Sequence, residues 1–476
     1  MTAMLFAAAL LLAGCGGTDD SPIAVSAIGG PPRLVNPNLQ PVDPPTAFLL
    51  QATAQGLVRF NAEGEIEPAL AQSWIVSDDG LRYTFRIRRL QWAGGGPVTA
   101  QQVAARLRAA LSRASRNPLK PVLGAVAEIE PMTDSVLEIS LRGPRPHFLQ
   151  LLAQPELAIL QNGRGTGPYR LAETESQGAR LVIERGEDET GPDLPDILLR
   201  AEAAPLAIAR FAERRSDLVL GGTARDLPFA RAADLPSSRL VFDPVSGLFG
   251  LAFASASGPL ADPEVRRALA MAIDRDSLVS ALGVPRLAPR TGLAAPGLAE
   301  LPAPAQPEWA ALPLEARRAR AAEAIAALGA EGPLRLRVAM PDGPGYRLVF
   351  AHLRRDWRIV GVEAERVRPG APADLRLVDS VAPANLASWY LRQFGCDASS
   401  VCDAAADQAL AAARLAPTAA ERTAQFVIAD RILVELAPFI PLTGPVRWSL
   451  VSQRLRGFRA NPFARHSASE LIARQE

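Results

Sequence analysis

The stretch EPALAQSWIVSDDGLRYTFRIRRLQWAGGGPVTAQQVAARLRAAL, residues 67–111, decides the fold. Residues 74–76 are apolar and predict a short strand. The DDG sequence at 78–80 is typical of a tight turn, because glycine accepts a positive φ and aspartate tolerates it. Residues 83–88 then alternate apolar and polar side chains, which is the period of a half-buried strand. This part of the stretch therefore predicts a hairpin.

A helix is predicted directly after the hairpin and a glycine-rich break. Thr99 is a typical N-cap, and Gln102 three residues later completes the pattern of a capping box. Apolar residues then recur every four positions, at Val103, Leu107 and Leu111, and form one stripe on the helix.

The particular residues of this stretch resemble a signature of extracellular solute-binding proteins of family 5, the oligopeptide, dipeptide and nickel class. The strings that carry the resemblance are PALA, SW, VSDDGL, YTF and GGGPVTA. Three more strings resemble the same family in the same order: GTGPYRL at 165–171, LAF followed by PLADPEVRRALAMAIDRDSLV at 251–279, and APFIPL at 437–442. Members of this family are the ligand-capturing subunits of ABC importers.

The resemblance implies an α/β fold of the periplasmic-binding-protein type, with two lobes joined by a hinge (class II type) and a small extra domain. The expected division, by residue number, is a lipoprotein signal peptide and tether at 1–20, lobe I at 21–50, a small accessory domain at 51–161, lobe I again at 162–243, lobe II at 244–436, and a return to lobe I at 437–476.

Local signals support lobe II. Asp262 is a good N-cap and Pro263 suits the first position of the helix that follows. Gly283 is expected to end the next helical segment. Arg266 and Arg267 are expected at the surface or in ion pairs.

Composition limits the function classes. A chain of 476 residues is long enough for two or three domains. The formal net charge of +1 argues against a nucleic-acid surface, which needs a basic excess. No apolar run reaches the roughly 18–20 residues of a membrane-spanning helix.

The amino-terminal segment is read as a targeting signal. The apolar run at 4–13 has the length of a signal-peptide core. It ends in LAGC, which resembles a lipobox and implies lipidation of Cys15. Two acyl chains would anchor the protein to the membrane, at the periplasmic face of the cell envelope. The alternative is a buried N-terminal helix.

The other two cysteines, Cys396 and Cys402, lie six residues apart. A local disulfide is expected, in keeping with an oxidising compartment, and two free thiols are the alternative. A metal site is not expected here, because no histidine is near in sequence and zinc needs more ligands.

One candidate ligand-binding residue emerges, within LVDSVAPANL at 377–386. Asp379 falls where peptide-binding members of the family have an aspartate that pairs with the ligand's α-ammonium, and Pro383 and Asn385 support this register. Arg376 stands where the family has tryptophan. A buried carboxylate is costly without a partner, which an ammonium would supply. The alternative is a solvated aspartate at a strand end.

The resemblance implies a substrate-binding subunit that captures a small solute, foremost a short peptide. It would deliver this solute to a membrane permease powered by an ATPase, both separate chains. No cofactor, nucleic acid or catalysis is expected, since a transport receptor breaks no bond. One alternative is an envelope hydrolase, but His147, His352 and His466 are the only histidines, and none lies in a catalytic motif. Another is a diverged sensor or scaffold lipoprotein. The ligand stays open, because peptide, opine, sugar, nickel-chelate and haem binders share this fold.

Overall fold

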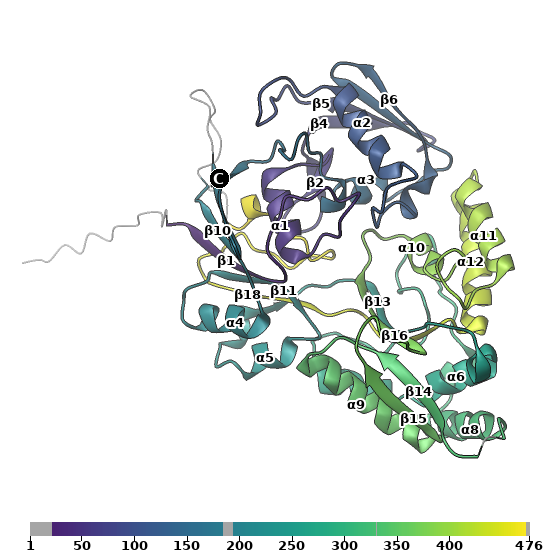
Figure 1. The fold of residues 1–476 in the computed structure, drawn as a ribbon. Helices are drawn as coiled ribbons and strands as arrows, with labels where there is room; N and C mark the ends of the chain where they lie inside the picture. Colours follow the sequence, from purple (N-terminus) through teal and green to yellow (C-terminus); the bar gives the residue numbers. More distant parts are fainter. Residues whose placement is uncertain (1–20, 184–193, 330, 473–476) are drawn as a thin grey trace, which may run out of the picture.

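The computed structural model describes residues 21–183, 194–329 and 331–472. It contains two large lobes and a small domain (Figure 1). Cys15 and the expected signal peptide lie outside the described residues. Within these residues, no helix combines the length and apolar character that a membrane crossing requires.

Lobe I is built around a seven-stranded sheet with the order β12-β18-β11-β1-β10-β9-β8. Its strands are β1 (Ile23–Ile28), β8 (Tyr169–Glu175), β9 (Gly178–Ile183), β10 (Ile197–Glu202), β11 (Leu218–Thr223), β12 (Leu240–Phe242) and β18 (Arg447–Val451). Helices α1 (Pro44–Thr53), α4 (Ala204–Ala212) and α5 (Leu227–Ala232) belong to the same lobe. Alternating side chains of β11 place Leu218 and Leu220 in the core with α1, and Val219 in the core with α4.

Lobe II is built around a five-stranded sheet with the order β15-β14-β16-β13-β17. Its strands are β13 (Gly247–Phe253), β14 (Leu334–Ala339), β15 (Val362–Val367), β16 (Leu375–Val381) and β17 (Phe439–Thr443). Its helices are α6 (Pro263–Met271), α7 (Arg275–Leu282), α8 (Leu314–Ala326), α9 (Pro344–Ile359), α10 (Ala387–Arg392), α11 (Ala404–Leu415) and α12 (Ala419–Leu436). β14 and β15 pair in parallel and are connected through α9, so they form a β-α-β unit.

The small domain contains the stretch at 67–111. Its elements are β2 (Val58–Phe60), β3 (Ile66–Pro68), β4 (Ala71–Val76), β5 (Arg82–Ile87), α2 (Ala100–Leu111), β6 (Val126–Thr133), β7 (Val136–Leu141) and α3 (Phe148–Leu152). Both halves of the predicted capping box are present, between Thr99 and Gln102. The apolar core of this domain is continuous with α10, α11 and α12 of lobe II.

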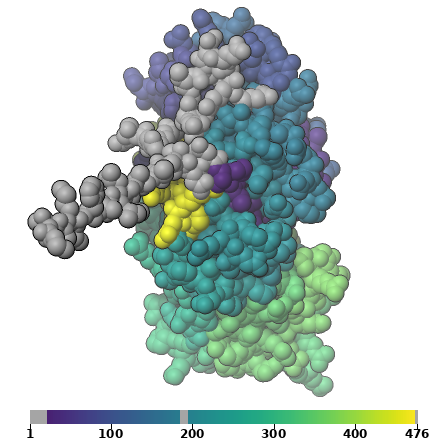
Figure 2. All heavy atoms as spheres, turned by 90° about the vertical axis from the view of Figure 1, so that its left-hand side faces the viewer, coloured from purple at the N-terminus to yellow at the C-terminus, as the bar shows by residue number. Residues whose placement is uncertain are grey.

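The two lobes are connected twice in the described chain, between β12 and β13 and between β17 and β18. The first connection falls at the expected boundary near 243. The second falls after Thr443, not at 436/437, because β17 still pairs with β13 of lobe II. In Figure 2 lobe I lies between the small domain and the green lobe II, and its teal, purple and yellow atoms come from distant parts of the chain.

Arg266 corrects one expectation. Its residue is only 2% exposed, and its guanidinium donates to the carbonyl oxygens of Leu260, Ala261, Leu436 and Ala437. It therefore fastens the end of α12 to the start of α6 through main-chain acceptors, instead of lying at the surface. Arg267, as expected, pairs with acidic side chains, those of Glu264 and Glu435.

Candidate functional site

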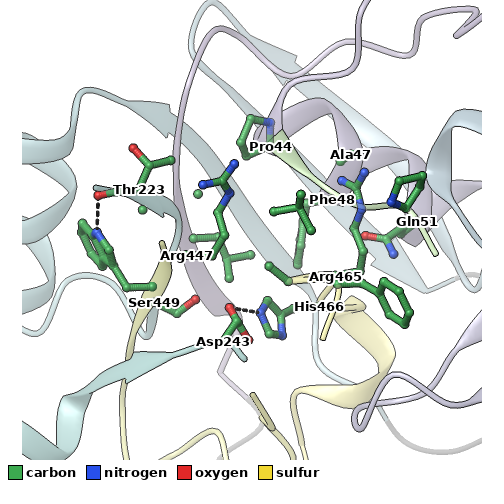
Figure 3. Close-up of a pocket in the computed structure, with 18 of the residues that line it drawn as sticks. Pro44, Ala47, Phe48, Gln51, Thr223, Asp243, Arg447, Ser449, Arg465 and His466 are labelled. Atoms are coloured by element: carbon green, nitrogen blue, oxygen red, sulfur yellow. Dashed lines mark hydrogen bonds and ion pairs between the residues drawn. The ribbon is translucent and has the colours of Figure 1, made fainter. Parts of the chain in front are cut away.

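A cavity of about 350 Å³ lies where the two lobes and the small domain meet (Figure 3). Lobe I contributes the first turns of α1, the end of β11 and the start of β18. Lobe II contributes the end of β16 with the residues that follow it, 380–383. The apolar walls include Phe48 and Phe463. The volume is at the small end of the ~300–1,000 Å³ that is usual for small-molecule sites.

Free main-chain edges face this cavity. β16 pairs with β13 along its whole length, but with β14 only at Leu375 and Arg376. Ala382 donates its N–H to the Ser246 carbonyl oxygen on the β13 side. Because the ladder alternates, Asp379 and Val381 direct their main-chain groups to the other side, where the Asp379 carbonyl oxygen accepts from Arg447 Nη2 at 3.2 Å. β11 likewise pairs with β1 from Leu218 only as far as Leu220, so its last residues have no strand partner on that side.

A close approach between Gly222 and Trp448 shapes the lobe I wall. The indole Nε1–H donates to the carbonyl oxygen of Thr223 at 2.8 Å. A Cβ atom at Gly222 would lie 2.2 Å from the Trp448 ring. Only glycine lets the indole lie against β11 here, so this position fixes one wall of the cavity.

The structure places Asp379 beside the cavity, with a partner other than an ammonium. Arg447 Nη1 donates to Asp379 Oδ1 at 2.7 Å, and the Tyr346 hydroxyl donates to Asp379 Oδ2 at 2.7 Å. Burial and the charge of Asp379 raise the pKa of Tyr346, which keeps that hydroxyl protonated as a donor. The solvated-aspartate alternative does not describe this environment, since the side chain is 8% exposed.

Arg465 is a second cation in the lining. Its Nε donates to Gln154 Oε1 at 3.0 Å and its Nη2 to Glu156 Oε1 at 2.8 Å. Both partners belong to the small domain, whereas Arg465 is in the carboxy-terminal segment. Figure 3 shows the Arg447 and Arg465 side chains directed toward the α1 residues Pro44 and Ala47.

His466 also lines the cavity, with both ring nitrogens engaged. Its Nε2 lies 3.2 Å from Asp243 Oδ2, and its Nδ1 lies 3.4 Å from Asn461 Nδ2. Because the asparagine amide is a donor, Nδ1 accepts and Nε2 donates to Asp243. No cluster of three or more His, Cys, Asp or Glu side chains suited to a metal ion occurs in the parts of the chain that the structure describes.

Sequence reasoning missed Arg447, Arg465 and His466. Each lies in the last 30 residues, after the last of the family-like strings, APFIPL at 437–442. The VRW sequence at 446–448 alternates as a strand but does not indicate which charge faces a ligand. Arg447 reaches the site because β18 pairs with β11, across more than 200 positions of the chain. Arg465 and His466 follow β18 and are held at the site by side chains of Gln154, Glu156 and Asp243.

The lobes are in contact on both sides of the cavity. Between lobe I and lobe II, Arg225 Nε donates to Asp342 O at 2.6 Å, and Gly345 N donates to Arg225 O at 2.9 Å. Between lobe II and the small domain, Asn385 N donates to Gln150 Oε1 at 3.1 Å. The structure is therefore a closed arrangement of the lobes, with a cavity that stays partly open to solvent.

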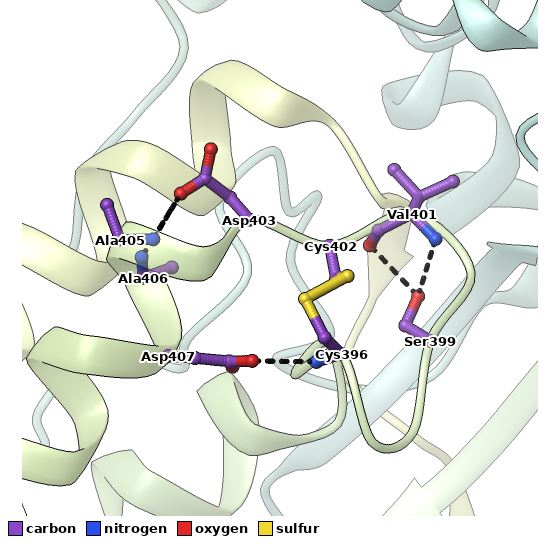
Figure 4. Close-up of a disulfide and its surroundings, with 8 residues drawn as sticks. All are labelled: Cys396, Ser399, Val401, Cys402, Asp403, Ala405, Ala406 and Asp407. Atoms are coloured by element: carbon purple, nitrogen blue, oxygen red, sulfur yellow. Dashed lines mark hydrogen bonds between the residues drawn. A yellow bond between two sulfur atoms is a disulfide. The ribbon is translucent and has the colours of Figure 1, made fainter.

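Cys396 and Cys402 are bonded in the structure, with their Cα atoms 5.0 Å apart (Figure 4). The loop precedes α11. Asp407 of this helix accepts the Cys396 N–H at 3.0 Å, and Asp403 caps the helix at its first turn. The disulfide lies outside the cavity lining and holds a loop of lobe II.

Comparison with known proteins gives concordant matches. The model of bacterial extracellular solute-binding proteins, family 5 Middle, matches residues 65–390. The nickel-binding periplasmic protein of Escherichia coli K12 is 28% identical over 52% of this chain and 50% of its own length. The glutathione-binding protein GsiB of E. coli O1:K1 is 27% identical over 54% of this chain and 55% of its own length. The chain thus spans about half the length of these curated relatives.

Three longer matches cover most of the chain. The di/tripeptide-binding protein 1 of Pseudomonas aeruginosa is 24% identical over 87% of both chains. Haemophilus influenzae OppA, solved in complex with RPPGFSPFR, superposes with a TM-score of 0.84 at 18% identity, over 96% of this chain and 100% of that one. The murein tripeptide binding protein MppA of E. coli gives a TM-score of 0.83 at 22% identity, over 96% and 99%. The periplasmic-binding-protein fold expected from the sequence is confirmed, and the chain belongs to family 5 of the bacterial extracellular solute-binding proteins.

Proposed function

We propose that this protein is the substrate-binding subunit of an ABC importer and that its ligand is a short peptide. The observation that carries the proposal is the cavity between the lobes, at which β11 and β16 each lack a strand partner on one side. An extended peptide can add to such edges through main-chain hydrogen bonds, which tolerate many side chains. The cavity volume of about 350 Å³ favours a peptide of two or three residues.

The cavity favours a peptide over a metal ion held directly by protein side chains. The relative from E. coli K12 is named as a nickel-binding protein. Here the one histidine of the lining, His466, uses both ring nitrogens within the protein, and Asp243 beside it accepts from His466 and from the Asn461 N–H. A direct nickel site would have to break this buried network.

We propose that Asp379 belongs to the ligand site. The direct ammonium contact that the resemblance implies requires Arg447 and Tyr346 to release the carboxylate. Until they do, Asp379 contributes by holding Arg447 at the cavity wall.

The partners and location follow from the same proposal. A permease and an ATPase would be separate chains, and the lobes would open and close by a hinge at the two crossovers. Lipidation of Cys15 would keep the receptor at the periplasmic face of a membrane. The Cys396–Cys402 disulfide is compatible with this oxidising compartment. Catalysis is not part of the proposal.

Calorimetry and thermal denaturation with a panel of di- and tripeptides test this function. A ligand at 100 times its Kd should stabilise the protein by about 2.7 kcal/mol. Recovered peptides should be unchanged by mass spectrometry, whereas cleaved peptides would favour the hydrolase alternative. No heat and no stabilisation with any peptide would contradict a peptide ligand.

A further inference from the structure

We propose that the cavity selects solutes that carry a carboxylate, that Arg447 binds this carboxylate with Arg465 as the second cation, and that Asp379 positions Arg447. This inference rests on the proposed function and names the chemistry of its ligand. It differs from the expectation that Asp379 itself contacts an ammonium.

The charges that line the cavity are predominantly positive. Arg447 and Arg465 are in the lining, whereas their carboxylate partners Asp379 and Glu156 are not. The one acidic side chain in the lining is Asp243, and both its oxygens are engaged, by His466 and by the Asn461 N–H. A ligand in this cavity therefore meets two guanidinium groups and no free carboxylate among the described residues.

Arg447 keeps donors for a ligand. A guanidinium offers five N–H donors. Nη1 donates to Asp379 Oδ1 at 2.7 Å and to Val446 O at 2.8 Å, and Nη2 donates to Asp379 O at 3.2 Å. Nε–H and the second Nη2 hydrogen have no protein partner in the described part of the chain. These two hydrogens lie on one edge of the guanidinium, which is the edge that binds a carboxylate through two parallel bonds.

Arg465 is arranged in the same way. Nε donates to Gln154 and one Nη2 hydrogen to Glu156, so the Nη1 group stays available. Each arginine is thus fixed on one edge by buried acceptors and open on another. This is the pattern of a preorganised anion site, because the side chains need no ordering when the ligand arrives.

An ammonium meets a less favourable site. To reach Asp379 it would have to displace the guanidinium of Arg447, whose side chain is 17% exposed, and the Tyr346 hydroxyl. The displaced cation would remain in the same small cavity, next to the new one. A ligand carboxylate would instead bind the open edge of the Arg447 guanidinium, while Asp379 holds the opposite edge.

The test compares matched ligands on the full-length protein by isothermal titration calorimetry. The dipeptides Ala-Ala and Ala-Glu are each used free, C-terminally amidated and N-acetylated, and Ala-Gln is the neutral match for Ala-Glu. Amidation is expected to weaken binding at least about tenfold, as for loss of a charge-assisted bidentate pair. N-acetylation is expected to change the Kd by less than about threefold. Succinate, a dicarboxylate without a peptide bond, distinguishes a general carboxylate site from a peptide site.

Variants connect the effect to these residues. In Arg447→Gln the free and amidated peptides are expected to bind equally, and Arg447→Lys should keep part of the preference. Arg465→Gln should reduce the preference for Ala-Glu over Ala-Gln. Arg335→Gln removes an exposed arginine of β14 that is remote from the cavity lining, and should bind like the wild type. Circular dichroism melting of each variant shows whether it is folded.

The outcomes separate this inference from the function it rests on. Peptides that bind equally well when amidated, or that lose binding on N-acetylation, overturn the carboxylate inference and favour Asp379 as an ammonium site, while the receptor function stands. Failure of every form to bind the wild-type protein rejects the peptide-receptor proposal together with the inference. Asp379→Asn should weaken the carboxylate preference without making the protein sensitive to N-acetylation, as expected of a positioning residue.

Discussion

The side-chain amide of Gln154 donates a hydrogen bond of 2.7 Å to the carbonyl oxygen of Pro383, and so connects the small domain to lobe II at the cavity wall. The same amide accepts from Nε of Arg465 at 3.0 Å, and Gln154 is only 2% exposed. One buried residue thus bridges the small domain, lobe II and the carboxy-terminal segment. All three must be in place for the bridge to form, so the bridge is a property of the closed arrangement.

Replacing Gln154 by alanine should weaken closure. The variant loses a bond to Pro383 and leaves the partly buried Arg465 Nε–H without its acceptor, a loss of about 1.5–3 kcal/mol for a charged donor. We expect about tenfold weaker ligand binding, mainly through faster dissociation, measured by stopped-flow fluorescence. Gln393→Ala is the control, since this exposed amide bonds only to Trp389 O one helical turn away. An unchanged dissociation rate in Gln154→Ala would show that the bridge does not hold the closed form.

Gly222→Ala should disturb the cavity wall. The new Cβ would lie 2.2 Å from the Trp448 ring, so the indole must move and its bond to Thr223 is strained. Overpacking of this kind costs ~1–3 kcal/mol of unfolding free energy. Both the urea midpoint and peptide affinity should fall. Gly124→Ala is a matched control, because its nearest neighbour is the flexible end of Arg414 at 3.7 Å. Equal stability of the two variants would contradict the prediction.

The sequence predicts those features of the structure whose interacting residues lie close together along the chain. The Thr99 capping box and the Asp262 N-cap are read correctly because all their partners lie within three residues. The left-handed Gly283, with φ of 58°, ends α7 for an equally local reason. The fold was predicted from several strings that resemble the family and occur in the family's order along the chain.

The site is less predictable. Asp379 was found through its resemblance to a family motif, but its partner Arg447 lies 68 residues away and was not. Arg266 was misread because sequence patterns treat arginine as a surface residue, whereas its acceptors are main-chain oxygens 5 to 171 residues away. Every residue has a main-chain carbonyl, so a sequence does not indicate which carbonyls an arginine will bind. The contact of Arg266 with the end of α12 is therefore seen only in the folded structure.

Reducing the Cys396–Cys402 disulfide should lower stability moderately. A loop this short gains about 2 kcal/mol from cross-linking in the chain-entropy model. The bond also holds the Cys396 N–H against Asp407 at the start of α11. We expect a lower Tm in reducing buffer, and the same Tm in both buffers for the double variant Cys396→Ser/Cys402→Ser. A Tm that is unaffected by reductant would mean that the bridge does not form in solution. Peptide affinity should change little, because the loop is outside the cavity lining.

Asp430 should make stability depend on pH. Burial raises its pKa to about 6, against the opposing effect of the hydrogen bond from the Ala305 N–H. The raised pKa means that the folded state binds the proton more tightly than the unfolded chain. The contribution is therefore fully present below about pH 4, the unfolded pKa, and is lost as the pH rises through about 6. Two pKa units correspond to at most about 3 kcal/mol.

Asp430→Asn should remove this dependence. The amide oxygen can still accept from Ala305 N, as Asp430 Oδ2 does at 2.6 Å, but no charge is buried above pH 6. We expect the variant to be more stable than the wild type at pH 7.5 by about 1–3 kcal/mol and nearly equal at pH 4, from urea denaturation across this range. Asp397→Asn, at a side chain that is 78% exposed, is the control and should leave the pH profile unchanged. If the wild type and Asp430→Asn had parallel profiles between pH 4 and pH 7.5, the buried carboxylate would have to be charged in both conditions and compensated by a neighbour.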